Sequence, residues 1–202
     1  TGVRTLEKRR VVIGMTGATG AIYGIRLLEL LREHSDCSRH LIISPWAEET
    51  ITYETGYTVP QVRSLADEVY DVRDLAAPVS SGSFQTLGMV VLPCSMKTLS
   101  AIAHGYDDNL IVRAADVTIK EGRPLVLCPR ESPLSAIHLE NMLKLSRLGV
   151  KLVPPMPNFY QHPATIDDLV RYQVIRTLDQ LGLHLEDAGR WGEGGDYSGS
   201  TI

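Results

Sequence analysis

The sequence has few cysteines, few aromatic residues and no long hydrophobic run. Its 202 residues include three cysteines, two tryptophans and two phenylalanines. The cysteine count is odd, and no Cys-x-x-Cys pair or Cys/His ligand spacing occurs, so neither a disulfide framework nor a metal site is expected. Cys94 and Cys128 end apolar runs, where we expect reduced, half-buried thiols in a cytoplasmic protein. A nucleophilic Cys94 is the alternative, but no base stands beside it.

An excess of positive charge is also absent. The chain carries 20 Lys and Arg against 24 Asp and Glu, a net charge of −4, whereas a nucleic-acid binder needs a basic surface. No apolar run approaches the roughly 18 residues of a membrane span, and no apolar segment follows the polar N-terminus as in a secretion signal. We expect a soluble protein with an N-terminal extension (1–9), one domain (10–188) and a Gly-rich tail (189–202).

Short apolar runs alternate with segments of helical periodicity. Strands are predicted at 11–13, 39–44, 89–93, 125–128 and 150–153, while residues 55–87 give a mixed pattern. Helices are predicted at 22–31, 45–54, from about 99, and at 107–121, 135–148 and 166–181. This alternation predicts an α/β domain with a doubly wound, Rossmann- or flavodoxin-like, mostly parallel sheet and helices on both faces. Ligands of such sheets bind beyond the carboxyl ends of the strands.

Two strand-to-helix turns have the composition of phosphate-binding sites. The turn GMTGATGA (14–21) combines small residues, the hydroxyls of Thr16 and Thr19, and a helix start whose N–H groups we expect to be unpaired. Ser95, Met96, Lys97 and Thr98 repeat this chemistry after the strand at 89–93. The alternatives are a tight turn and a capping box, both without a ligand. Ser44 ends the second strand where a dinucleotide site has an acidic residue, which disfavours a dinucleotide.

Charged residues elsewhere have both ordinary and functional interpretations. Arg113, Asp116 and Lys120 share one helix face, either as a solvated ion-paired surface or as part of a site. Arg130 and Glu131 directly follow a buried strand, where a carboxylate could transfer protons. Tyr160 and Trp191 either pack in the core or form pocket walls, and Arg176 is a surface arginine by default.

Seven stretches together resemble the UbiX family of flavin prenyltransferases. They are GMTGATGA (14–21), SSGSF (80–84), LPCSMKTLS (92–100), RAAD (113–116), KE (120–121), PLVLCPRE (124–131) and NFY (158–160). The resemblance extends from about residue 10 to residue 191. It implies a metal-independent enzyme that joins the dimethylallyl group of dimethylallyl phosphate to N5 and C6 of reduced FMN. The prenylated FMN would serve a separate UbiD-type decarboxylase, and a dodecamer is implied.

The resemblance also assigns roles by position. It implies FMN binding by Gly17, Ala18, Thr19, Ser44, Ser95, Met96, Lys97, Thr98 and Arg130. It implies a dimethylallyl-phosphate site of Lys120, Glu131, Tyr160 and Arg176, and catalytic roles for Glu131, Ser81, Lys120, Arg113 and Glu54. Trp191 also matches a position near the pocket, and Thr19 replaces the Ser of many relatives. Two alternatives are a flavin-dependent decarboxylase and a non-catalytic flavin-carrying subunit. The cysteine decarboxylases use a catalytic His and a Pro-x-Met-Asn motif, whereas Pro129, Arg130, Glu131 and Ser132 follow the corresponding strand here.

Overall fold

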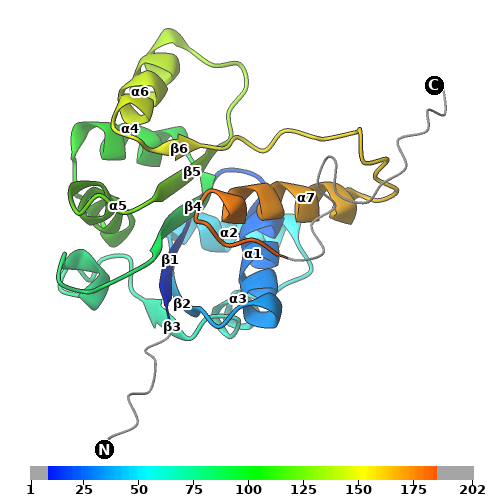
Figure 1. Ribbon diagram of the computed structural model, residues 1–202, viewed down its shortest axis with the longest axis horizontal. Coiled ribbons are helices and arrows are strands. Elements are labelled where there is room, and N and C mark those ends of the chain that lie inside the picture. The colour runs from blue at the N-terminus through cyan, green and yellow to red at the C-terminus, as the bar shows by residue number, and fades with distance from the viewer. Residues whose placement is uncertain (1–8, 186–202) are drawn as a thin grey trace, which may run out of the picture.

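The fold is a single parallel sheet covered by helices on both faces (Figure 1). The structure, a computed structural model, describes residues 9–185; the predicted extension, apart from Arg9, and the predicted tail with Trp191 lie outside them. The strand order is β3-β2-β1-β4-β5-β6, and every pairing is parallel. The strands are β1 (Arg10–Met15), β2 (Ser38–Ile43), β3 (Glu68–Tyr70), β4 (Gly88–Cys94), β5 (Leu125–Pro129) and β6 (Lys151–Leu152). The predicted doubly wound architecture is confirmed.

The helices fall on the two sides of this sheet. They are α1 (Ala21–His34), α2 (Pro45–Glu54), α3 (Val59–Arg63), the 3-10 turn η1 (Pro78–Ser80), α4 (Met96–His104), α5 (Leu110–Lys120), α6 (Ala136–Arg147) and α7 (Ile166–Asp179). Figure 1 shows α1 and α7 on one face and α4 and α5 on the other. None of the helices in the described part of the chain is long and apolar enough to cross a membrane.

Side-chain alternation along the strands explains the two layers. In β1, Val11 and Ile13 join the core formed with α1 and α7, whereas Val12 joins the core formed with α4 and α5. Every residue of β4 and β5 is buried, since both faces of a central parallel strand are covered. The apolar runs that predicted these strands therefore supply both cores.

The structure differs from the predictions at the strand β3 and at the starts of α4 and α5. The edge strand β3 was not predicted, because Glu68 and Val69 are exposed and give no apolar run. Helix α4 starts at Met96 rather than near residue 99, since the Ser95 hydroxyl accepts from the Thr98 N–H and caps the helix. Helix α5 starts later than residue 107, after Asn109 caps it.

All strands of a parallel sheet end on one side and begin on the opposite side. We call the side where the strands end the carboxyl edge and the side where they begin the amino edge. Helix α5 runs from one to the other. Its start lies near the carboxyl edge, where the Leu110 N–H donates to the Val72 carbonyl just after β3 (2.7 Å). Its end lies at the amino edge, where the Arg123 guanidinium donates to the carbonyls of Gly82 and Phe84 before β4.

Candidate active site

Thr16 joins the two predicted phosphate-binding turns at the carboxyl edge. Its buried hydroxyl donates to the Pro93 carbonyl and accepts the Ser95 N–H, both at 2.8 Å. The expectation that this hydroxyl is offered to a ligand is therefore wrong, because both of its bonds are internal. Thr16 instead fixes the turn after β1 against the turn after β4, a role that the sequence did not indicate.

Close backbone approach shapes the turn after β1. A Cβ on Gly17 would lie 2.4 Å from the Trp46 Cβ, so no larger residue fits without a shift. Ala18 and Thr19 continue the turn, and Thr19 is exposed. Ser44, at the end of β2, caps α2 by accepting the Ala47 N–H at 3.2 Å. The turn is therefore open to a ligand on its outer side while α2 supports its inner side.

Glu54 occupies the start of α1. Its Oε2 accepts the N–H of Gly20 at 2.8 Å and of Ala21 at 3.2 Å. The expectation of unpaired N–H groups at this helix start is therefore wrong for these two residues. The reason is tertiary, because the end of α2 brings a carboxylate to the positive end of the α1 dipole.

A cavity of about 730 Å³ adjoins this carboxylate. It is lined by Gly17, Thr19, Pro45, Trp46, Glu49, Thr50, Tyr53 and Glu54. Trp46 and Tyr53 are 75% and 88% exposed, and they were not among the predicted site residues. The two residues are seven positions apart, which places them on the same face of α2, and this spacing could have indicated them from the sequence.

The turn after β4 presents hydroxyl and cationic groups. The Ser95 hydroxyl donates to the Thr98 Oγ1 at 3.1 Å, and Met96 and Lys97 begin α4 beside them. Arg130 follows β5, and its N–H donates to the Cys94 carbonyl at 3.2 Å. Within residues 9–185, the side chains of Lys97 and Arg130 have no ion-pair partner. Two cations are thus available to an anion at this edge.

Glu131 lies beside Arg130 at the same edge. It is exposed, and its Oε1 accepts the Ser132 N–H at 3.0 Å. The carboxyl edge thereby brings together the predicted FMN-binding residues with Glu54 and Glu131.

Lys120 and Ser81 lie at the opposite, amino edge. The Lys120 ammonium contacts the Glu121 carboxylate at 2.5 Å, and this contact lowers the pKa of Glu121. A Cβ on Gly82 would lie 2.8 Å from the Lys120 Nζ, so the Ser81–Gly82 loop rests against this ion pair. One copy of the chain does not bring these residues to the carboxyl edge.

Arg113 lies one turn into α5, between the two edges. Its guanidinium contacts Asp116 at 3.0 Å and Asp107 at 3.1 Å. The predicted shared face of Arg113 and Asp116 is confirmed, but Lys120 pairs with Glu121 instead. Asp107 was not predicted as a partner.

Tyr172 lies between Tyr160 and Arg176: it contacts Tyr160 through the two hydroxyls and stands one helical turn before Arg176. The Tyr160 hydroxyl is 2.5 Å from the Tyr172 hydroxyl, and Arg176 stands one turn further along α7. Arg176 also contacts Asp179 at 2.9 Å. These two predicted substrate-binding residues therefore form a unit on α7 and the loop before it.

The buried cysteines are unsuited to nucleophilic chemistry. Cys94 and Cys128 are fully buried, and burial raises the pKa of both thiols. The three cysteines are free and buried. Cys94 and Cys128 thus lie deeper than the half-buried position that the sequence predicts for them. In residues 9–185 no group of three His, Cys, Asp or Glu side chains could hold a metal ion.

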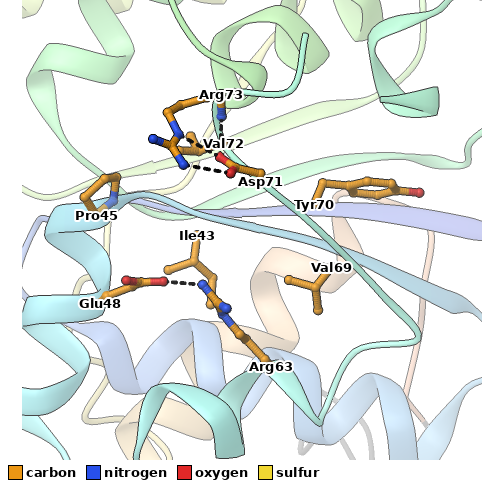
Figure 2. A pocket seen from close by; sticks show the side chains of 9 residues that line it. All are labelled: Ile43, Pro45, Glu48, Arg63, Val69, Tyr70, Asp71, Val72 and Arg73. Atoms are coloured by element: carbon orange, nitrogen blue, oxygen red, sulfur yellow. Dashed lines mark hydrogen bonds and ion pairs between the residues drawn. The ribbon is translucent and has the colours of Figure 1, made fainter. Parts of the chain in front are cut away.

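A second cavity, of about 550 Å³, lies at the carboxyl ends of β2 and β3 (Figure 2). Both guanidinium groups that line it are paired, Arg63 with Glu48 at 2.5 Å and Arg73 with Asp71 at 3.0 Å. Hydrogen bonds from Arg73 lower the pKa of Asp71 to about 2. This cavity contains none of the predicted site residues.

Comparison with known proteins identifies the family. The flavoprotein family model matches residues 2–177. A protein of Escherichia coli O157:H7 described as a "Probable UbiX-like flavin prenyltransferase" is 58% identical over 90% of this chain and 92% of its own length. The chain belongs to the UbiX-like flavin prenyltransferase family. It is therefore a flavoprotein that uses FMN, and its class of reaction is prenyl transfer.

Two solved structures of UbiX-like proteins share this fold. AnUbiX in complex with FMN and dimethylallyl pyrophosphate is 53% identical, with a TM-score of 0.90 over 92% of this chain and 98% of that one. A dodecameric FMN-dependent UbiX-like decarboxylase from Escherichia coli O157:H7 is 58% identical, with a TM-score of 0.88 over 90% and 98% of the two chains. The peptidyl-cysteine decarboxylase EpiD, at 20% identity and a TM-score of 0.57, shares the fold alone.

The carboxyl edge of this UbiX-like chain suits FMN. The turns after β1 and β4 are fixed to each other by Thr16, and the close approach at Gly17 leaves no room for a Cβ. Lys97 and Arg130 supply positive charge at the same edge, as a phosphate requires.

Proposed function

We propose that this protein joins the dimethylallyl group of dimethylallyl phosphate to N5 and C6 of reduced FMN in a site that at least two copies of the chain build together. One observation carries the composite site: Lys120 and Ser81 lie at the amino edge, away from the carboxyl-edge turns. The seven-residue strand β4 separates the two edges by roughly 20 Å. No side chain spans that distance, so another copy must supply these groups.

The carboxyl-edge residues bind and orient FMN in this proposal. The backbone of Gly17, Ala18 and Thr19 lies against the flavin, and Ser44 and Thr98 offer hydroxyl donors. Ser95 caps α4 and so positions the backbone N–H groups of Met96 and Lys97 as further donors. Arg130 and Lys97 neutralise its phosphate. Reduced FMN supplies the nucleophilic N5 and C6 positions.

Other residues act on the allylic substrate. Lys120, Tyr160 and Arg176, with Arg113 nearby, bind the phosphate and stabilise the charge that develops as it leaves. Phosphate binding also holds the small prenyl group in a productive orientation. As the new ring closes, the double bond of the N5-bound prenyl group gains a proton and C6 loses one, so the step is balanced. Glu131 accepts the proton from C6, and Glu54 and Ser81 line the pocket.

The product and assembly follow from the same proposal. Prenylated FMN serves a separate UbiD-type decarboxylase, and the working assembly is a dodecamer, as the relative from Escherichia coli O157:H7 is described. A cytoplasmic location agrees with three free, buried cysteines.

The test is anaerobic incubation of the purified protein with reduced FMN and either dimethylallyl phosphate or the pyrophosphate. Mass spectrometry should show FMN enlarged by one five-carbon unit with the monophosphate. Recovery of unmodified FMN alone would contradict the proposal. Transfer only from the pyrophosphate would retain the reaction and change the donor.

Glu131→Gln tests the proton acceptor. It should retain FMN binding and lower turnover about 100-fold, because the amide cannot accept the proton. Unchanged turnover would remove Glu131 from the chemistry.

A direct decarboxylase is the second candidate, because one of the related structures is described as an FMN-dependent decarboxylase. Carbon dioxide release from a phenolic acid by this protein alone, without added prenyl donor, would favour it.

A further inference from the structure

Arg123 holds the loop before β4 (residues 81–85) from one side. Its guanidinium donates to the Gly82 carbonyl at 2.6 Å and to the Phe84 carbonyl at 2.9 Å. The N–H groups of an arginine form a rigid planar fork, so one side chain fixes both carbonyls at once. The loop is therefore tied at two points to the segment that follows α5.

The end of α5 gives Arg123 a fixed place beside Lys120. Gly122 has a left-handed backbone (φ 65°), and its N–H donates to the Ile119 carbonyl at 3.0 Å. The Arg123 N–H donates to the Thr118 carbonyl at 3.0 Å, so the chain closes back on the last turn of the helix. The side chains of Lys120 and Arg123 therefore start from the same closed turn.

The other side of the loop is held through Phe84. The Arg10 guanidinium lies over the Phe84 ring, with its Cζ 4.6 Å from the ring centroid. The His40 ring meets the Phe84 ring edge-on, with 5.4 Å between the centroids. Ser81 and Ser83 of the loop are exposed, and their hydroxyls are 2.9 Å apart. These exposed serines are thus carried by a backbone that is anchored on both sides.

The anchored loop touches the Lys120–Glu121 ion pair. A Cβ on Gly82 would lie 2.1 Å from the Glu121 Oε1 and 2.8 Å from the Lys120 Nζ, so the loop backbone and the ion pair are in contact. A half-exposed lysine side chain otherwise has many rotamers to choose from. The backbone of the loop therefore limits the positions that the Lys120 ammonium can take.

We infer that Arg123 is a positioning residue for prenyl transfer. It fixes the loop so that Ser81 and Lys120 are presented to the allylic phosphate in one arrangement, and it acts through these two residues. The inference rests on the proposed function, which assigns them to the site. The family resemblance gives Arg123 no role, because this residue falls between two of the stretches that carry it. Loss of Arg123 should therefore impair use of the prenyl donor and spare the turns that bind FMN.

The experiment compares Arg123→Met with full-length wild type in anaerobic turnover of reduced FMN and dimethylallyl phosphate. Methionine retains a long side chain but donates no hydrogen bond, so both loop carbonyls lose their donor. The kcat/KM for dimethylallyl phosphate should fall about tenfold or more, while the Kd for FMN stays within about twofold.

Arg39→Met is the matched control. Arg39 is next to His40 in β2, so its side chain points to the opposite face of the sheet from Phe84. It pairs with Asp67 at 2.9 Å. Its loss should lower the Tm and leave kcat/KM and the Kd for FMN at wild-type values.

Arg123→Ala with added guanidinium separates positioning from a general structural loss. A guanidinium ion can occupy the space left by the side chain and donate to the same two carbonyls. Guanidinium chloride should raise the kcat/KM of this variant about threefold or more over sodium chloride at equal ionic strength. Unchanged kcat/KM in Arg123→Met would overturn the inference. So would equal losses of FMN binding and donor turnover that guanidinium does not recover.

A binding measurement keeps this inference separate from prenyl transfer itself. Calorimetric titration of dimethylallyl phosphate into protein loaded with oxidised FMN requires no turnover. Arg123→Met should bind the donor about tenfold more weakly than wild type. Donor binding by wild type without transfer would contradict the proposed function alone. Equal donor affinity in wild type and Arg123→Met would contradict the positioning role alone.

Discussion

The two edges of the sheet carry polar groups that are held in different ways. At the carboxyl edge, backbone turns and helix caps position them: Thr16 joins two turns, and Ser44 and Ser95 begin helices. At the amino edge, the polar groups belong to exposed charged side chains that are held by ion pairs, such as that of Lys120 with Glu121. A fixed backbone site suits a ligand that must be oriented, whereas long exposed side chains suit contact with a ligand held on another copy.

Complementation between copies gives the largest expected effect. Arg130→Ala alters the carboxyl edge and Lys120→Met alters the amino edge, and each should lower turnover about 100-fold or more. If sites combine the two edges from different copies, co-expression of the two inactive chains restores activity. Random mixing leaves about a quarter of the sites with both native residues.

The control places both substitutions in one chain and co-expresses it with each single variant. Such mixtures contain no site with both native residues, so they should remain inactive. Activity absent from the mixture of single variants, despite mixed assemblies seen by native mass spectrometry, would place the complete site within one copy.

Two glycine substitutions separate binding from turnover. Gly17→Ala places a Cβ 2.4 Å from the Trp46 Cβ, and the required backbone shift should weaken FMN binding about tenfold or more. Gly82→Ala places a Cβ 2.1 Å from the Glu121 Oε1 and displaces the Lys120–Glu121 ion pair. It should lower turnover while the Kd for FMN stays within about twofold. Gly56→Ala is the control, because no atom lies within 4 Å of its added carbon. Equal loss of FMN binding by Gly17→Ala and Gly82→Ala would remove the distinction between the edges.

Thr16→Val tests the connection within the carboxyl edge. Valine matches threonine in shape but leaves the Ser95 N–H and the Pro93 carbonyl without this partner, at a cost of about 1–3 kcal/mol. FMN titration should show about fivefold to tenfold weaker binding, with Thr16→Ser close to wild type. If the Thr16→Val variant binds FMN as tightly as the Thr16→Ser variant does, the Thr16 hydroxyl does not position the two turns.

The smallest expected effect is on stability, from the substitution of His40, which lies near the amino edge. It is buried, with Nδ1 2.8 Å from the Tyr70 hydroxyl and Nε2 3.1 Å from the Ser38 hydroxyl. Burial, with the Arg10 charge, lowers its pKa, so the unfolded chain binds more protons below pH 6.5. Stability is therefore present above pH 6.5 and is lost as pH falls towards the lowered pKa. Between pH 7 and pH 5, the Tm of His40→Gln should fall about 2 °C less than that of wild type. If the Tm of His40→Gln and that of wild type fall by the same amount, the pH dependence of stability belongs to other groups.

Much of the fold followed from local patterns. Buried parallel strands are apolar throughout, so the runs at β1, β4 and β5 predicted their positions, and hydroxyl residues marked the turns after β1 and β4. The edge strand β3 was missed because an edge position leaves Glu68 and Val69 exposed. Boundaries at α4 and α5 moved because Ser95 and Asn109, rather than the apolar pattern, set the helix starts.

The sequence by itself determined the family, the doubly wound architecture and the residue types available for FMN and phosphate chemistry, because motifs and periodicity are local. Only the tertiary structure decided which of those residues can meet. Glu54 reached the start of α1 through the path of α2, Thr16 turned inward to Ser95, and Lys120 was carried to the amino edge by α5. The physical reason is that a parallel sheet places strand ends and strand starts on opposite sides of the molecule. Lys120 and Arg130, which are ten positions apart in the chain, are thereby separated by the length of a strand.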